Sequence, residues 1–329
     1  MKKKVLLIRL DKIGDLICTM CVDQVSFLKD CEVQWVIAQG LSFIPENAEP
    51  RRQYIELSKT DWRASLNSLR RFLHNFKPDV AVSFQAPWWV SYALWAEGVP
   101  VRTGVKSQWH SFLFLNKGLR QKRSQATQHE ADYNLDLLLH AFDIDENVLQ
   151  EKTPILQLNA PENAALLEKH GLNIKKYVVV HPGMAGSALN WPISSYISLI
   201  EDITKDTQVV LTGTSGDEPW LKDIKEKFKD HPRVLSLQNR LNPVELFTVL
   251  KNAKAVVVPS TGVAHMAASL GTPVLGIYSP LRVQHPRRWA ARGKEVHIFV
   301  PAVSDMDNVN PDCMKEIQPQ DLLKTLSSL

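Results

Sequence analysis

Short apolar runs alternate with segments of helical periodicity along this chain, and the alternation occurs twice. In the first half, the runs KVLLIRL, VQWVIA and DVAVSF are each followed by apolar residues spaced as on one face of a helix. The second half restarts the pattern with YVVVHPG, QVVLTGT, AVVVPS and PVLGIYS. Such alternation is typical of a parallel sheet covered by helices. The sequence therefore predicts an α/β protein with two Rossmann-like, doubly wound domains facing a central cleft.

The pattern changes near residue 158, where Pro154 and Pro161 flank a short strand. A chain of 329 residues is longer than one hydrophobic core usually serves. We therefore expect domains over residues 1–158 and 159–329, with the final helix able to pack back on the first domain. We also expect a helix from about Asp15 to Lys29 and an irregular, basic region from Lys106 to Gln128.

The composition fits a soluble globular protein, with 44% hydrophobic and 22% charged residues. The net charge of +4 is mild, so any basic surface must be local and a nucleic-acid partner is not indicated. Arg9, Asp11 and Lys12 interrupt the first apolar run far short of a signal peptide. No apolar run approaches the ~18 residues of a membrane span. We expect a cytoplasmic protein, at most peripheral at the inner face of the cytoplasmic membrane.

Cys18 and Cys21 form a C-x-x-C pair, which in isolation is compatible with a redox pair or half a zinc site. No second pair with metal-ligand spacing accompanies it, and the surrounding segment has helical apolar periodicity. We therefore expect both thiols to be packing residues.

Three loops follow predicted strands, where doubly wound sheets bind their ligands. In RLDKIGDL, Gly14 permits a tight turn and Asp15 stands in the first turn of the next helix. A carboxylate there is a catalytic candidate. It is equally a helix starter, worth about 0.5 to 1 kcal/mol through the helix dipole.

The other two loops have few bulky side chains. HPGMAGSALNWP has glycines and small residues that let backbone amides approach an anion, although it lacks both the Walker and the G-x-G-x-x-G patterns. In PSTGVAH, Ser260 or Thr261 can cap a helix, Gly262 leaves the helix entrance uncovered, and His265 lies one turn further in. The alternatives are a turn without a ligand and an ordinary cap. Together, the loops favour a site for a nucleotide diphosphate.

Six segments then follow one another in an order that covers nearly the whole chain: KVLLIRLDKIGDLICTMCV, VRTGVKSQWHSFLFL with QHEADYNLDLLLHAFDI, VVVHPGMAGSALNWP, VVLTGTSGDEP, VVVPSTGVAHMAASLGTPVLGIYSP and DCMKEIQPQDLLKTL. In this order they resemble glycosyltransferase family 9, the bacterial heptosyltransferases of lipopolysaccharide core assembly. The resemblance implies a GT-B fold and an inverting transfer of a heptose from ADP-heptose to a lipopolysaccharide core acceptor. It implies no cofactor.

The resemblance also implies roles for particular residues. Asp15 would be the general base that deprotonates the acceptor hydroxyl. Glu218 would contact the nucleotide ribose, and His265 would support the diphosphate site. The diphosphate itself would be held by residues of the two small-residue loops: Gly183, Gly186, Ser187, Ser260, Thr261 and Gly262. Because those loops contain no Asp-x-Asp motif, we expect no metal ion to be needed.

Two positions depart from the family pattern. Leu189 stands where many members have a lysine, and Ser260 stands where many have an aspartate. These departures leave open a different nucleotide sugar, a different surface-glycan acceptor, or a degenerate member that binds nucleotide or glycolipid without turnover.

An acidic glycolipid acceptor is expected to meet basic residues of the first domain: Lys12, Lys117, Arg120, Lys122 and Arg123. Tryptophans of the same domain would add to that surface: Trp88, Trp89, Trp95 and Trp109. The alternative is a solvated loop beside core aromatic residues.

Overall fold

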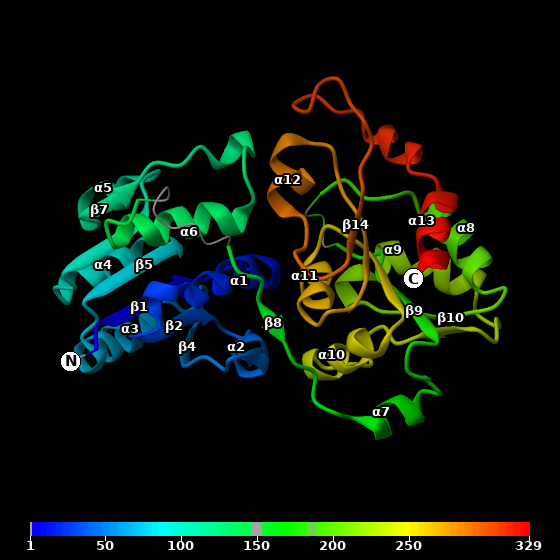
Figure 1. Cartoon of the computed structure of the whole chain (residues 1–329), viewed down its shortest axis with the longest axis horizontal. Coiled ribbons are helices and arrows are strands. Elements are labelled where there is room, and N and C mark those ends of the chain that lie inside the picture. The colour runs from blue at the N-terminus through cyan, green and yellow to red at the C-terminus, as the bar shows by residue number, and fades with distance from the viewer. Residues whose placement is uncertain (1, 146–152, 185, 187) are drawn as a thin grey trace. The chain divides into compact units, whose positions relative to one another are not determined.

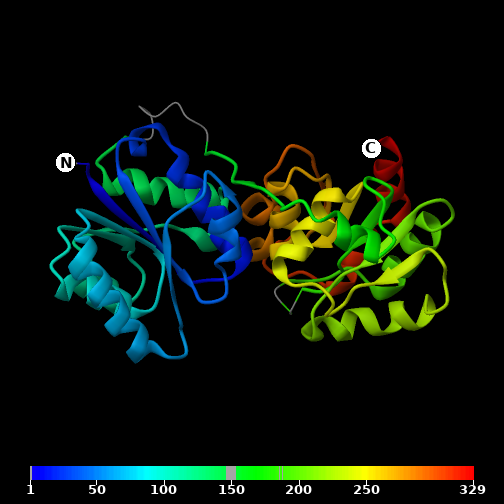
Figure 2. The same ribbon diagram turned by 90° about the horizontal axis from the view of Figure 1, so that it is seen from below.

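The computed structural model describes residues 2–145, 153–184, 186 and 188–329 (Figure 1). The chain divides into two compact units. The first comprises Met1–Arg123 and Thr127–Leu156, and the second comprises Ser124–Ala126 and Gln157–Leu329. Sequence placed this division near residue 158. Each unit contains a six-stranded parallel sheet with helices on both faces, which confirms the predicted α/β class (Figures 1 and 2).

The sheet of the first unit has β1 at its centre. Its strand order is β4 (Tyr54–Leu57), β2 (Glu32–Ala38), β1 (Lys4–Arg9), β5 (Val80–Gln85), β6 (Val101–Val105) and β7 (Lys117–Leu119). The chain moves outward from β1 on one side and then returns to β5 on the other. The switch point of this sheet, where ligands bind in doubly wound folds, therefore lies between β1 and β5.

Helices cover both faces of this sheet. Leu6 and Ile8 of β1 pack in a core cluster with residues of α3 (Trp62–Phe76) and α4 (Trp88–Ala96). On the other face, α1 (Ile13–Met20) contacts α6 (Glu130–Ala141), which lies against β5 and β6 (Figure 1). Burial on both faces explains why β1 and β5 are almost wholly apolar. The remaining helices are short: α2 (Phe43–Asn47) and α5 (Trp109–Phe114).

The second unit repeats the same strand order. It runs β11 (Val234–Ser236), β10 (Gln208–Leu211), β9 (Tyr177–Val180), β12 (Ala255–Pro259), β13 (Val274–Ile277) and β14 (Val296–Phe299). Its switch point lies between β9 and β12. The helices are α7 (Ala164–Lys169), α8 (Ile193–Ile203), α9 (Glu218–Lys227), α10 (Pro243–Asn252), α11 (Gly262–Ser269), α12 (Pro286–Trp289) and α13 (Pro319–Ser328). All residues of β9 and β12 are buried.

Several local predictions were wrong. The first helix ends at Met20 and continues as two 3₁₀ turns, because Val25 adopts an extended backbone between them. Gly14 lies inside this helix and not in the preceding turn. The region 106–128 is also more regular than expected, since it contains α5 and β7. Three strands of the six-stranded sheets escaped prediction, namely β4, β7 and β14. They are edge strands and only partly buried, so they lack a continuous apolar run.

The final helix packs within the second unit, and its predicted packing on the first domain stays a prediction. Leu322 and Leu326 of α13 are buried in the same core cluster as Leu199 and Ile200 of α8. The indole N–H of Trp191 donates to the carbonyl of Ile317 just before α13 (2.9 Å). The apolar face of the helix is thus buried inside its own unit.

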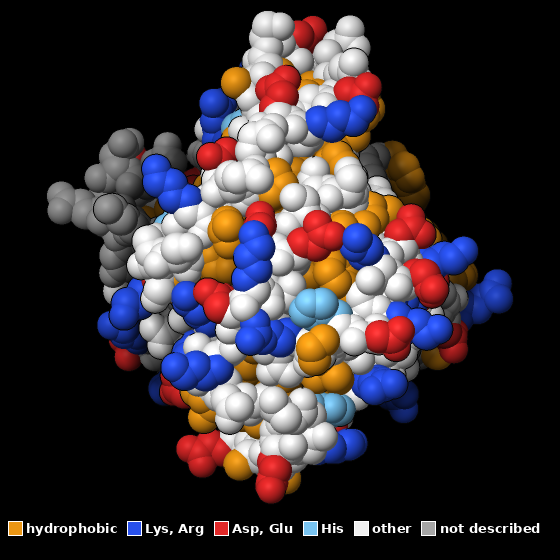
Figure 3. Space-filling model, turned by 90° about the vertical axis from the view of Figure 1, so that its right-hand side faces the viewer, with side chains coloured by type: hydrophobic (Ala, Val, Ile, Leu, Met, Phe, Trp, Pro, Cys, Tyr) orange, Lys and Arg blue, Asp and Glu red, His pale blue; other side chains and the backbone are white. Residues whose placement is uncertain are grey.

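Other sequence expectations concern single residues and surfaces. Cys18 and Cys21 are both buried thiols, as predicted, and burial raises the pKa of Cys18 well above its usual value. On the face drawn in Figure 3, basic and acidic side chains are interspersed, so that face carries no extended area of one charge. Within the described ranges, no helix is both long and apolar enough to span a bilayer.

Candidate functional site

Asp15 lies at the switch point of the first sheet, in the first turn of α1 directly after β1. Lys12 is extended and begins the helix, which points the first turn back over the carboxyl end of the strand. Arg9 is the last residue of β1, and its guanidinium contacts one carboxylate oxygen of Asp15 (2.5 Å). The side chain of Asp15 retains 22% exposure, so its carboxylate can reach a ligand.

The guanidinium of Arg9 is almost completely buried and is shared by three carboxylates. It lies 3.2 Å from Asp11, 2.5 Å from Asp15 and 3.3 Å from Glu130. Glu130 is fully buried and also pairs with Arg123 (2.5 Å). Burial lowers the pKa of Arg9, but the attraction of its carboxylate partners outweighs burial and leaves that pKa raised. Arg9 is therefore a permanent cation that fixes the orientation of Asp15.

The pKa of Asp15 is raised above that of an ordinary aspartate. Burial is the largest cause, and the negative charges of Asp11 and Glu130 add to it, while Arg9 opposes both. A carboxylate with a raised pKa is a stronger base than an exposed one. The geometry therefore equips Asp15 to accept a proton from a hydroxyl group.

Two loops flank the switch point of the second sheet. They follow β9 and β12, and these strands are joined there by a bond from His181 N–H to the Val257 carbonyl (2.9 Å). Burial lowers the pKa of His181 to about 4, although the nearby Asp217 opposes the shift. His181 is therefore neutral, and its Nδ1 bonds to the Thr212 hydroxyl (3.0 Å). This imidazole supports the loop and adds no charge to it.

Gly183 is required by the close approach of Asp217. A Cβ at position 183 would overlap the Asp217 carboxyl group. That carboxylate accepts bonds from the backbone N–H (2.8 Å) and the hydroxyl (2.9 Å) of Thr214, which fix the loop after β10. Gly186 has φ +70°, a left-handed conformation that favours glycine. Ser187, predicted to bind the diphosphate, lies outside the described residues.

The N-terminus of α11 follows β12 and presents uncapped amides. Thr261 is the N-cap residue, but neither its side chain nor that of Ser260 makes the predicted capping bond. The Thr261 hydroxyl oxygen is buried and lacks a hydrogen-bond partner among the described residues. His265, one turn into the helix, is buried. Because amide dipoles make this end of the helix positive, it is suited to an anion that also bonds the Thr261 hydroxyl.

Glu218 begins α9 and is exposed on the same unit. Hydrogen bonds from Lys225 (2.7 and 3.0 Å) and Gln238 (2.8 Å) lower the pKa of this carboxyl group. It is therefore ionised, with its orientation fixed by two neighbours. Its predicted contact with the nucleotide ribose stays a prediction.

The basic residues predicted for the acceptor have different surroundings. Arg123 pairs with the buried Glu130 and bonds Asn134 (3.1 Å), and its predicted role in acceptor binding stays a prediction. Lys117 pairs with Asp143 (2.5 Å). Lys12, Arg120 and Lys122 are exposed. Of the four tryptophans, Trp89 belongs to the core, whereas the others are 40 to 62% exposed: Trp88, Trp95 and Trp109.

Comparisons with known proteins identify the family of this chain. The family model for glycosyltransferase family 9 (heptosyltransferase) matches residues 66–316. The chain belongs to glycosyltransferase family 9. A Haemophilus influenzae protein whose glycosyltransferase name is provisional is 30% identical over 204 residues, which cover 59% of this chain and 58% of the relative. The alignment therefore spans less than two thirds of that relative's length.

Solved structures establish the fold of this family 9 chain. A family 9 glycosyltransferase from Veillonella parvula aligns with a TM-score of 0.80 and 17% identity, covering 99% of this chain and 96% of that one. The E. coli ADP-heptose lipopolysaccharide heptosyltransferase II aligns with a TM-score of 0.78 and 18% identity, covering 100% and 98%. Both confirm the predicted GT-B architecture of two parallel-sheet domains.

The departure at position 189 has a structural explanation in this family 9 member. Leu189 packs against the core cluster of the second unit, and its backbone N–H donates to the side-chain carbonyl oxygen of Gln284 (3.1 Å). A hydrophobic side chain is thus used for packing at the position where the family pattern predicts a lysine.

Asp-x-Asp triplets do occur elsewhere in this family 9 chain. Asp143 of the first triplet pairs with Lys117, and Asp307 of the second is held by both guanidinium nitrogens of Arg282 (2.6 and 2.7 Å). In the part of the chain that the structure describes, no group of three His, Cys, Asp or Glu side chains is placed to hold a metal ion.

Sequence reasoning missed the residues that hold the candidate groups in place. Asp217 had a local signal, since Thr214 and Asp217 have the spacing of a capping box, and the structure forms one. Arg9 also had a local signal in the sequence, because it is a charged residue at the end of an apolar run. Glu130 had none, because its partner Arg9 is 121 residues away.

Gly183→Ala should destabilise the protein more than the same substitution at Gly216. The new Cβ displaces Asp217 and breaks its bonds to Thr214, so we expect a loss of about 1 to 3 kcal/mol in unfolding free energy. Denaturant unfolding measures it. Gly216→Ala is the matched control, because a Cβ at position 216 would lie 3.6 Å from the Thr214 hydroxyl oxygen, an ordinary van der Waals contact. Equal stability of the two variants would contradict the role of Gly183.

Proposed function

We propose that this chain is an inverting glycosyltransferase that moves a heptose from ADP-heptose to a lipopolysaccharide core acceptor. The observation that carries the proposal is Asp15, a carboxylate with a raised pKa, held by a buried cation at the switch point of the first sheet. Family membership and the open N-terminus of α11 support it. On this proposal, the first unit binds the acceptor and the second binds the donor.

The proposed reaction forms one bond and breaks one. The acceptor hydroxyl oxygen attacks the anomeric carbon of the donor sugar, while the bond from that carbon to the diphosphate oxygen breaks. The hydroxyl proton passes to Asp15, and the electron pair of the broken bond leaves with the nucleoside diphosphate. Backbone amides of Gly183, Thr261 and Gly262 stabilise the negative charge that develops there. These amides serve the purpose of a metal ion, and no cofactor takes part.

The identity of the donor is proposed by analogy. A structural relative is named as an ADP-heptose lipopolysaccharide heptosyltransferase. Leu189 and Ser260 keep a second candidate open, namely a member that binds nucleotide or glycolipid without turnover, or one that uses another nucleotide sugar or surface glycan. A cytoplasmic location, peripheral at the inner membrane face, agrees with a glycolipid acceptor and with exposed Trp95 and Trp109.

The nucleotide proposal predicts selective binding of ADP. Calorimetric titration should give a dissociation constant about tenfold lower for ADP than for UDP or GDP, a difference of about 1.4 kcal/mol. Thr261→Val should weaken ADP binding, because it removes the buried hydroxyl and keeps the shape of the side chain. Stronger binding of UDP or GDP would reassign the donor, and no binding of any of the three would refute the nucleotide site.

Asp15→Asn should abolish transfer and leave nucleotide binding intact. The amide keeps the size of the side chain but does not accept the proton, so we expect kcat to fall about 10²- to 10⁴-fold. A transfer assay measures the loss, and titration with ADP shows whether the second unit is unaffected. Asp11→Asn is the control, since Asp11 also pairs with Arg9 without being the proposed base. Full activity of the Asp15 variant with the wild-type ADP affinity would exclude the assigned role.

The pH dependence of transfer should reveal the raised pKa of Asp15. Only the ionised carboxylate accepts a proton, so kcat/KM should fall as the pH drops through that pKa. An ordinary aspartate titrates near about 3.9, and the decline should therefore begin at a higher pH than such a group would give. The measurement is kcat/KM against pH, over the range in which circular dichroism shows the protein to be folded. A profile that stays flat down to the ordinary aspartate range would contradict the burial of Asp15.

A further inference from the structure

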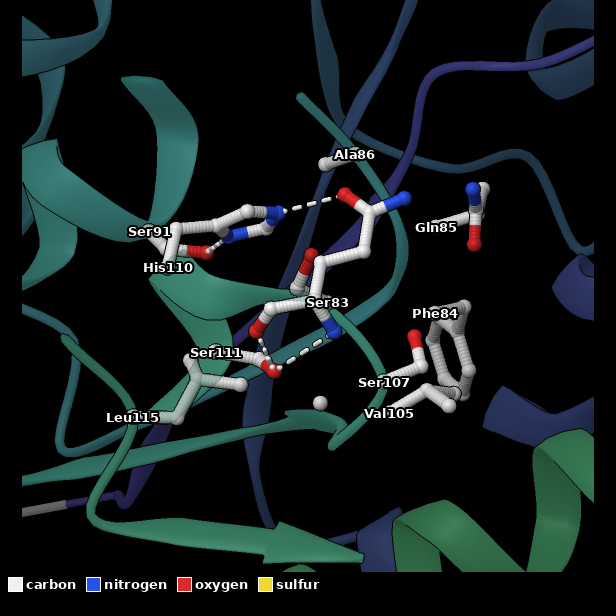
Figure 4. A pocket seen from close by; sticks show the side chains of 12 residues that line it. Ser83, Phe84, Gln85, Ala86, Ser91, Val105, Ser107, His110, Ser111 and Leu115 are labelled. Carbon is white, nitrogen blue, oxygen red and sulfur yellow. Dashed lines mark hydrogen bonds between the residues drawn. The ribbon is translucent and has the colours of Figure 1, made fainter. Parts of the chain in front are cut away.

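A recess opens in the first unit at the carboxyl ends of β5 and β6, beside α5 (Figure 4). Its cavity volume is about 30 Å³, room for about two water molecules, so it can receive hydroxyl groups of a ligand but not a whole sugar ring. Ser83 and Gln85 come from β5, Ser107 and Gln108 from the segment after β6, and His110 from α5. We call this recess the neutral pocket.

The lining of this pocket is polar but uncharged. None of the twelve described residues that line it is Lys, Arg, Asp or Glu. Burial lowers the pKa of His110, so its imidazole is neutral. Hydroxyl and carboxamide groups both donate and accept hydrogen bonds, as sugar hydroxyls do. A phosphate or carboxylate ligand would find no opposite charge among these side chains.

The polar groups are held in fixed positions. One ring nitrogen of His110 bonds the carboxamide oxygen of Gln108 (2.8 Å), and the other bonds the Ser91 hydroxyl (3.3 Å). The Ser111 hydroxyl donates to the backbone carbonyl of Gln108 (2.5 Å). These contacts orient the Gln108 amide group, while the side chains of Ser83 and Gln85 bond to no other described residue. The pocket thus keeps unused hydrogen-bonding groups beside a rigid wall.

The neutral pocket lies at the same edge of the sheet as the proposed base. Gln85 is the register partner of Arg9 across the switch point, and its carbonyl accepts a bond from Leu10 N–H (3.1 Å). Arg9 is the residue that holds Asp15. The pocket and Asp15 therefore both lie at the carboxyl edge of the first sheet.

Aromatic side chains lie next to the pocket. Trp109 is 62% exposed, and its ring is 5.8 Å from that of His110. Trp88, 40% exposed, lies 6.5 Å from Trp109. An exposed indole offers an apolar face beside polar groups, which suits the C–H face of a pyranose ring. In contrast, the basic residues Lys117 and Arg123 already pair with protein carboxylates.

We propose that the neutral pocket receives the hydroxyl edge of an uncharged sugar unit of the acceptor, a hexose or heptose pyranoside without phosphate or carboxylate. The ring itself rests outside the pocket, against Trp109, and directs another hydroxyl toward Asp15. This inference rests on the proposed glycosyltransferase function and specifies its acceptor. It replaces the basic loop as the part of the first unit that recognises the sugar to be extended.

The test is binding of simple glycosides to the full chain. Saturation-transfer NMR should detect methyl α-mannopyranoside or methyl β-glucopyranoside, and should give weaker signals for glucose 6-phosphate and for methyl glucuronide. The double variant Ser83→Ala/Gln85→Leu should raise the dissociation constant of the neutral glycoside at least about tenfold, which corresponds to about 1.4 kcal/mol. Gln53→Leu, an exposed glutamine outside the pocket, is the matched control and should bind as wild type.

Titration with ADP separates this inference from the function on which it rests. If ADP binds and the neutral glycosides do not, or if the double variant binds them like wild type, the pocket assignment is wrong and the donor proposal stands. Stronger binding of the charged sugars also overturns the neutral pocket. If the glycosides bind as expected and ADP does not, the pocket assignment stands and the donor proposal fails.

Discussion

The buried guanidinium of Arg9 is the interaction on which the first unit depends. A buried charge is costly unless it is paired, and here one cation is shared by Asp11, Asp15 and Glu130. The sharing joins the central strand to α1 and α6. It also keeps Asp15 in place. The pKa of Asp15 nevertheless stays raised, because burial of that carboxylate outweighs the attraction of Arg9. Structural support and basicity thus come from the same group of charges.

The identical strand order of the two units explains where chemistry is placed. In each sheet, strands are first added on one side of the first strand and then on its other side. The loops at the point where this order reverses are not crossed by another connection. One unit places carboxylate and neutral polar groups there, whereas the other places glycines and a helix end. One architecture therefore presents different chemical groups at the same place, and the sequence of the loops decides which groups these are.

Much of this arrangement was readable from the sequence, for definable reasons. Central strands such as β9 and β12 are buried on both faces, so their apolar runs and the loops that follow them were evident. Edge strands such as β14 were not, because half-exposed residues leave no such run. The position of Asp15 was predicted, but its raised pKa depends on Glu130, whose proximity only the fold reveals. The neutral pocket likewise combines residues of two strands and a short helix, none of which forms a motif.

The separation of Arg9 and Glu130 has a consequence for how the first unit acquires its structure. The central strand carries a charge whose fully buried partner is 121 residues further along the chain. During synthesis, β1 leaves the ribosome long before α6 exists, so at first the guanidinium can pair only with its sequence neighbours Asp11 and Asp15. The buried set of charges is complete only after the helix emerges. Completion of this core is a late, long-range step of co-translational folding, because it requires Glu130 to have been synthesised.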